Sequence, residues 1–264
     1  MLSLALGLSA AQAALGLLSG SMVGFALGLV GGGGSILAVP LLVYVVGVAS
    51  PHEAIGTSAV AVALNALVNL ALHARKGHVK WPCGLVFAGA GFAGAWAGST
   101  LGKAVDGQAL LAAFAVLMIA IGLYSFLRRG REGEAKVRLS KRNAAPLVFG
   151  GLAAGALSGF FGIGGGFLIV PALMMATGMP PLAAIGTSLV SVASFGAATA
   201  GNYALSGLVN WPLAALFVLG GALGGYAGAQ AAARLALAKG RLEASFALFV
   251  VLVGVYVLAR ALLV

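Results

Sequence analysis

The chain has 264 residues, of which 61% are hydrophobic and only 8% charged, and its formal net charge is +10. Repeated apolar runs of about 18 residues or more exceed what a water-soluble core needs, so the composition excludes a soluble protein and indicates an integral membrane protein. Backbone amides in lipid must be satisfied internally, and period-two alternation is absent from the sequence. The spans are therefore predicted to be helices, which gives an all-α fold.

The first half divides into five apolar pieces, at residues 4–30, 35–49, 52–75, 82–103 and 107–128. At about 1.5 Å per residue the second piece covers about 22 Å, which is less than the hydrocarbon core of about 30 Å. It directly follows a glycine cluster at 31–34 that interrupts the apolar run. We therefore expect a short broken helix, or part of a re-entrant hairpin, after this cluster.

A basic linker separates the two halves. Lys and Arg are concentrated between Arg128 and Arg142, and such clusters collect on the cytoplasmic side of a membrane. The sequence therefore predicts a first transmembrane repeat at 1–129, a basic cytoplasmic linker at 130–144 and a second transmembrane repeat at 145–264.

The second half repeats the first at an offset of about 130 residues. Three motifs recur: a glycine-rich cluster (31–35 and 162–166), the quartet Ile-Gly-Thr-Ser (55–58 and 185–188) and the pair Trp-Pro (81–82 and 211–212). Five pieces per copy would turn the second copy upside down. That arrangement leaves every basic residue inside except Lys103 and Arg260, whereas parallel copies would move more of them outside. We therefore predict inverted-topology repeats with both termini outside.

The paired glycine clusters predict an anion site. A helix that begins inside the membrane has unpaired N–H groups and roughly half a positive charge at its N-terminus, so it attracts anions. In inverted copies, helices beginning at Ser35 and Gly166 are expected to approach a common point near the bilayer midplane. The predicted backbone ligands are Gly32, Gly33, Gly34, Ser35, Gly164, Gly165 and Gly166.

Polar side chains on the third pieces are predicted to complete this site. They are Thr57, Ser58 and Asn65 in the first copy and Thr187, Ser188 and Asn202 in the second. Polar atoms on one face of an apolar helix face either a cavity or another helix. Hydrogen bonding between helices, with no contact to substrate, is therefore an alternative role for each of them.

Ionisable groups inside the membrane are few. Proton coupling usually needs one, and the sequence offers His52, Glu53 and His73. Glu53 has a second interpretation, because it lies in the first turn of a helix opened by Ser50 and Pro51 and could cap it. No cofactor, metal site or enzyme activity is predicted. The glycine clusters lack the Lys-Ser or Lys-Thr of a nucleotide-binding loop, and Cys83 has no neighbouring metal ligand.

The segments Gly31–Pro40 and Gly162–Pro171, together with the repeated quartet, resemble the TauE/SafE sulfite exporter family over nearly the whole chain. The resemblance implies a bacterial or archaeal inner-membrane carrier that exports sulfite or organosulfonates with the proton gradient. Its expected partners are a small anion and the lipid bilayer, without nucleic acid, and a homo-oligomer stays open. Two alternatives also stay open: a passive anion channel that uses the same amides, and a scaffold subunit whose glycines only pack.

Overall fold

The structure is a computed structural model, and it describes residues 8–127, 139–162, 166–235 and 241–263. Within these residues the chain is helical and contains no strand, which confirms the predicted all-α fold. Seven helical stretches of the described chain are long and apolar enough to cross a membrane, and Ala10–Val46 counts as one of them. The helices are α2 (Ala10–Val30), η1 (Gly31–Leu37), α3 (Ala38–Pro40), η2 (Leu41–Val46), α4 (Pro51–Arg75), α5 (Trp81–Lys103), α6 (Gly107–Leu127), α7 (Lys141–Phe161), α8 (Gly166–Thr177), α9 (Pro181–Leu205), α10 (Trp211–Leu235) and α11 (Arg241–Leu263).

The first glycine cluster reverses the chain. Helix α2 ends at Val30, and Gly31 has φ +68°, a conformation that glycine adopts without the strain of a side chain. A Cβ on Gly34 would collide with the backbone of Ala26, so the chain folds back along α2. The short helix begins at Gly31 rather than at the expected Ser35. Glycines have no side chains to crowd the tight 3-10 winding of η1, so the cluster itself becomes helical.

The second glycine cluster also follows the end of a helix. Helix α7 ends at Phe161, and Gly162 again has φ +68°. Helix α8 begins at Gly166, as expected, and has 12 residues. At about 1.5 Å per residue it covers about 18 Å, so it is shorter than a membrane span.

Glycine faces bring helices from the two halves into close contact. Helix α2 packs along α10, where a Cβ on Gly20 or Gly24 would collide with the α10 backbone. Helix α5 packs along α7 in the same way, at Gly98 and Gly155. Small residues of this kind let membrane helices approach closely.

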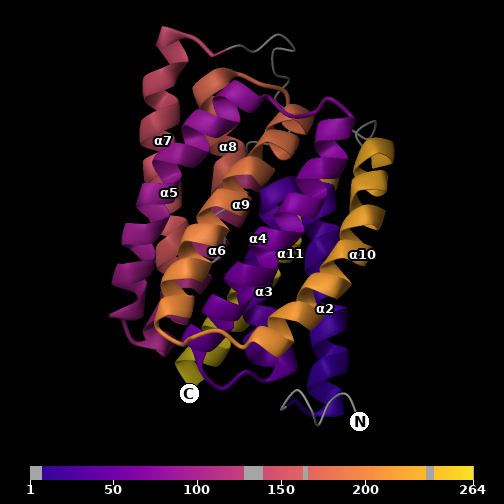
Figure 1. The fold of residues 1–264 in the computed structure, drawn as a ribbon, viewed down its shortest axis with the longest axis vertical. Coiled ribbons are helices and arrows are strands. Elements are labelled where there is room, and N and C mark those ends of the chain that lie inside the picture. The colour runs from indigo at the N-terminus through magenta and orange to yellow at the C-terminus, as the bar shows by residue number, and fades with distance from the viewer. Residues whose placement is uncertain (1–7, 128–138, 163–165, 236–240, 264) are drawn as a thin grey trace.

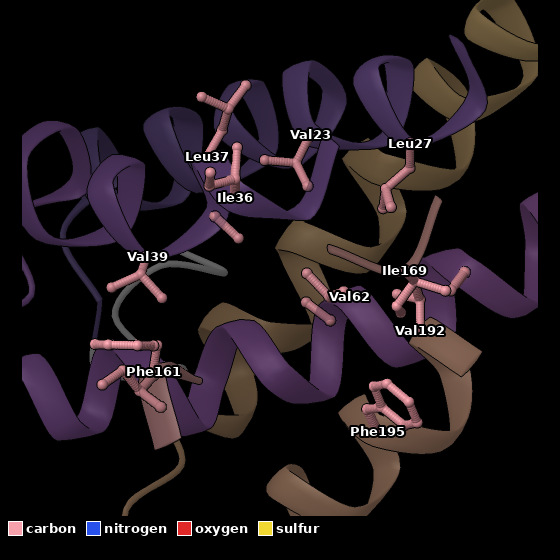
Figure 2. Packing of buried hydrophobic residues seen from close by; sticks show 14 of the residues in the cluster. Val23, Leu27, Ile36, Leu37, Val39, Val62, Phe161, Ile169, Val192 and Phe195 are labelled. Carbon is pink, nitrogen blue, oxygen red and sulfur yellow. The ribbon is translucent and has the colours of Figure 1, made fainter. Parts of the chain in front are cut away.

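Segment η1 lies in the interior of the bundle, with α8 packed against it. Figure 2 shows Ile36 and Leu37 of η1 close to Val23 and Leu27 of α2, with Ile169 of α8 in the same cluster. Segment η1 contacts α8, and α4 contacts α9. Every residue of η1 is buried, whereas Met175 of α8 is exposed.

Helices α4 and α9, which carry the two copies of the Ile-Gly-Thr-Ser quartet, run in opposite directions. A Cβ on Gly56, near the start of α4, would lie 2.9 Å from Cβ of Tyr203, near the end of α9. At the middle of the pair, Gly196 lies against Ala63. In Figure 1 the described chain begins and ends at one end of the bundle, whereas α7 begins and α10 ends at the other. Helices α4 and α9 are thus antiparallel.

Candidate functional site

The first glycine break is held by a side chain from the other half. The backbone N–H of Gly32 donates a hydrogen bond to Ser188 Oγ at 3.2 Å, and both residues are fully buried. The Ser188 hydroxyl in turn donates to the Ile185 carbonyl at 2.8 Å. A Cβ on Gly31 would lie 3.0 Å from Ser188 Oγ. The break of the first half therefore contacts the Ile-Gly-Thr-Ser quartet of the second.

The second break has the matching neighbour. A Cβ on Gly162 would collide with the side chain of Ile55, the first residue of the other quartet. The Ser58 hydroxyl donates to the Ile55 carbonyl at 2.9 Å, as its counterpart does in α9. Gly164 and Gly165 lie outside the described residues. Each break is thus seated against the quartet of the opposite half.

The two threonines of the quartets bind backbone amides. Thr57 Oγ1 accepts the N–H of Asn210 at 2.9 Å, and Thr187 Oγ1 accepts the N–H of Lys80 at 2.9 Å. Asn210 and Lys80 directly precede the Trp-Pro pairs that open α10 and α5. Each threonine therefore fixes the start of a helix in the opposite half, which matches the interhelical role that the sequence offered as an alternative.

The two breaks lie towards opposite ends of the bundle. Ile55 and Ile185 are both near the starts of their helices, and those helices are antiparallel, so the glycines seated against them are separated along the pair. This differs from the expectation that two helix N-termini approach one point near the midplane. Helix α2 has 21 residues and so covers about 31 Å before Gly31.

Some predicted ligands gather at the first break and others do not. Ser35 lies within the glycine segment, where its hydroxyl donates to the Gly32 carbonyl at 2.8 Å. Asn65 instead faces α10, with Nδ2 3.5 Å from the Phe217 carbonyl. Asn202 ties α9 to α5 by donating to Ser99 Oγ and accepting from the Lys103 ammonium. The described residues at the first break are Gly31, Gly32, Gly33, Gly34, Ser35 and Ser188.

The three ionisable candidates lie at the two ends of α4. His52 Nε2 is 3.1 Å from the Val105 carbonyl, and the Glu53 carboxylate accepts from Asn210 Nδ2 at 3.1 Å. Ser50 caps the helix by accepting the Glu53 N–H at 3.3 Å. His73 lies near the other end and donates from Nε2 to the Gly28 carbonyl of α2 at 3.1 Å. Of the three, His73 contacts the helix that leads into the first break.

Comparison with known proteins places this architecture in a family. Residues 16–257 match the family described as "Sulfite exporter TauE/SafE". A "Probable membrane transporter protein" of Xylella fastidiosa (strain Temecula1) is 51% identical over 248 residues, which cover 92% of this chain and 94% of the relative. The "Probable membrane transporter protein YunE" of Bacillus subtilis is 30% identical over 236 residues, covering 81% and 85%. An archaeal relative, from Methanocaldococcus jannaschii, is 27% identical over 218 residues, covering 75% and 79%.

No solved structure matches the chain. The family match spans both halves and both glycine breaks. The chain is therefore a multi-pass membrane protein of the TauE/SafE family, whose members are membrane transporters and not enzymes.

Proposed function

We propose that this chain is a secondary transporter, working as an exporter, of small sulfur-containing anions such as sulfite or organosulfonates. The anion is bound by the backbone amides at the two glycine breaks, Gly32 to Ser35 and Gly164 to Gly166. The hydroxyls of Ser58 and Ser188 complete the two half-sites. Thr57 and Thr187 position the helices around them.

The contact between Gly32 and Ser188 carries this proposal. A buried backbone N–H at a helix break can donate a hydrogen bond to an anion. Here the Gly32 N–H donates to a hydroxyl that belongs to the opposite half of the chain, at 3.2 Å. A hydroxyl both donates and accepts, so Ser188 can turn its hydrogen from the Ile185 carbonyl towards an anion. An anion at the break would then accept hydrogen bonds from both groups.

The antiparallel arrangement of α4 and α9 supports a carrier with alternating access. Helices α4 and α9 share the quartet at the same position and run antiparallel, as inverted copies would. In this proposal one half-site lies at the start of η1 and the other at the start of α8, and η1 and α8 pack against each other. Rocking one half against the other would expose one half-site at a time, with the anion passing along the two short segments near the midplane.

Replacing Ser188 tests the site. A hydrogen bond to a charged group contributes about 1.5–3 kcal/mol, so Ser188→Ala should weaken sulfite or sulfoacetate binding by about tenfold or more. Ser194→Ala is the matched control, because Ser194 donates to the Ala88 carbonyl at 3.2 Å from the same helix, away from the break. Affinity would be measured with purified protein and transport with proteoliposomes. Equal effects of the two variants, or no response of the wild-type protein to any sulfur-containing anion, would reject the proposal.

A further inference from the structure

We infer that His73, Asn69 and Asn65 form a proton-binding seam on α4 that couples proton movement to anion transport. The inference rests on the proposed transport function and names the residues of this chain that take up the coupling proton. We call these three residues the α4 seam. They are four residues apart, so they share one face of the helix, and all three are fully buried.

Three acceptor atoms of the seam have no hydrogen-bond partner within the described part of the chain. They are Asn65 Oδ1, Asn69 Oδ1 and His73 Nδ1. A buried polar atom without a partner costs about 1–3 kcal/mol, so three in one row call for a ligand that donates hydrogen bonds. Water donates hydrogen bonds and would relay a proton along the two amide oxygens to His73 Nδ1, the basic atom of the three, whereas an anion would be repelled by acceptors.

Glycines on the facing helices make room for the seam. A Cβ on Gly221 of α10 would collide with the Asn65 amide, and one on Gly225 would lie 2.6 Å from Asn69 Nδ2. A Cβ on Gly28 of α2 would lie 2.8 Å from Asn69 Oδ1. The amides therefore occupy the space between α4, α2 and α10 that side chains at these glycine positions would otherwise fill.

The hydrogen bond of His73 fixes its tautomer. A carbonyl oxygen only accepts, so Nε2 carries the hydrogen that bonds to the Gly28 carbonyl at 3.1 Å, and Nδ1 of the neutral ring has a free lone pair. A proton from water joins Nδ1 and gives an imidazolium that keeps the bond to Gly28. The same proton leaves Nδ1 when the ring returns to the neutral form. Protonation forms one N–H bond at Nδ1 and breaks one O–H bond of a hydronium ion, and deprotonation reverses both changes.

The Gly28 carbonyl links the seam to the anion half-site. In a continuous helix this carbonyl would accept the N–H of Gly32, but α2 ends at Val30. Gly32 donates to Ser188 instead, and the carbonyl accepts from His73. A positive charge on His73 would therefore lie one hydrogen bond away from the broken helix end and would favour an anion at the Gly32 amide. By linkage, the anion would favour the proton equally.

Charged and titratable groups near His73 come from the end of α4 and the loop that follows it. His78 lies 5.7 Å from it between ring centroids, and Lys76 donates to the Ala229 carbonyl of α10 at 3.1 Å. Burial and then the charge of Lys76 lower the pKa of His78, which disfavours its charged form. Helix α2 carries no titratable side chain, and the first charged residue of α10 is Arg234, whose side chain lies outside the described set.

Histidine NMR tests proton binding without any substrate. The chain has three histidines, so ¹⁵N-histidine labelling gives a spectrum that single His→Gln variants can assign. We expect the Nδ1 signal of His73 to shift reversibly to the protonated position as the pH falls, while Nε2 stays protonated. A His73 ring that stays neutral at every pH at which the protein remains folded would overturn the inference.

Transport measurements then test coupling. Proteoliposomes would be loaded with sulfoacetate, and accumulation driven by an imposed pH gradient would be compared with anion exchange in the absence of a gradient. His73→Gln and Asn65→Leu should lose gradient-driven accumulation selectively. Tyr203→Phe and Phe195→Leu, at the equivalent positions of α9, should retain it.

Two outcomes would overturn coupling through the seam. One is normal accumulation in His73→Gln, and the other is loss of accumulation and exchange in equal proportion. A wild-type protein that moves no sulfoacetate, sulfite or thiosulfate would instead reject the proposed function, and the NMR titration would still decide whether His73 binds a proton.

Discussion

Helices α4 and α9 occupy equivalent positions but differ in one buried row of side chains. At the positions of Asn65, Asn69 and His73 in α4, helix α9 carries Phe195, Thr199 and Tyr203. Phe195 lies against Gly91 and stacks on Phe87, with ring centroids 6.2 Å apart. Asn65 lies against Gly221, which matches Gly91, and reaches the backbone of Phe217, which matches Phe87.

This difference separates packing from function. The α9 row is filled by two aromatic rings, and its hydroxyls on Thr199 and Tyr203 do not take up a proton at physiological pH. The α4 row fills the same space with unpartnered acceptors and an imidazole. Because a fully buried Phe195 fits the position that Asn65 occupies in α4, the unpartnered Asn65 amide costs stability, and we infer that it is retained for the proton.

The largest effect is expected from giving α9 the polar residue of α4. Phe195→Asn removes a fully buried ring from its contacts with Phe87 and Gly91 and leaves a cavity with an unpartnered amide. Loss of a buried Phe side chain costs about 3–5 kcal/mol. The free energy of unfolding, measured by steric trapping in bilayers or thermal unfolding in detergent, should fall by that amount. A loss below about 1 kcal/mol would show that α9 accommodates polar residues as α4 does.

A smaller loss is expected from filling the two matching glycines. A Cβ on Gly91 would collide with the Phe195 ring and lie 2.7 Å from the Gly151 carbonyl, whereas one on Gly221 meets the Asn65 side chain. Overpacking costs about 1–3 kcal/mol. Gly91→Ala should lower the free energy of unfolding more than Gly221→Ala, because its Cβ also collides with the Gly151 backbone. In a double-mutant cycle, adding Asn65→Ala to Gly221→Ala should partly restore the free energy of unfolding.

Gly89→Ala is the control for both glycine variants. Gly89 lies on α5, two residues from Gly91, and a Cβ there meets nothing within 4 Å. Alanine stabilises a helix relative to glycine by about 0.5–1 kcal/mol, so this variant should be slightly more stable than the wild type. Destabilisation by all three variants alike would mean that close packing does not explain the glycines.

The two halves should respond equally where their contacts match. Thr57 and Thr187 each accept the N–H that precedes a Trp-Pro helix at the same distance, 2.9 Å. Loss of a cap of this kind costs about 1 kcal/mol, so Thr57→Ala and Thr187→Ala should destabilise the protein by similar amounts. Thr→Ser at either position keeps the hydroxyl and should restore most of the loss. Clearly unequal effects would show that the two contacts differ in strength.

Much of this architecture is predictable from the sequence. Apolar runs marked the helices to within a few residues, as with the expected 52–75 and the observed Pro51–Arg75. The start of α8 at Gly166 followed from the glycine cluster, because a chain without Cβ atoms can leave and re-enter a helix there. These features depend on local chemistry, which the sequence carries directly.

The site was harder to predict because it depends on which helices face one another. Nothing local to Thr187 indicates that its partner is the Lys80 amide, and nothing local to Ser188 indicates Gly32. Periodicity identified the polar face of α4. It does not tell whether that face lies against a glycine break or against α10, so the sequence predicts Asn65 as an anion ligand. The repetition of the motifs was the available signal, because each copy of a motif contacts the opposite half of the chain.

The smallest effect on stability is expected from the change that makes α4 resemble α9. Asn65→Leu keeps the volume of the side chain and removes an acceptor that has no partner in the described chain, so the free energy of unfolding should stay within about 1 kcal/mol of the wild type or rise. Gradient-driven accumulation of sulfoacetate should nevertheless be lost, whereas Phe195→Leu should leave it intact. A destabilised Asn65→Leu protein would mean that the amide holds α4 to α10 through the Phe217 carbonyl, 3.5 Å away. A stable protein without coupling would assign the polar row to transport, because the same substitution would then have improved or preserved the fold while removing the function.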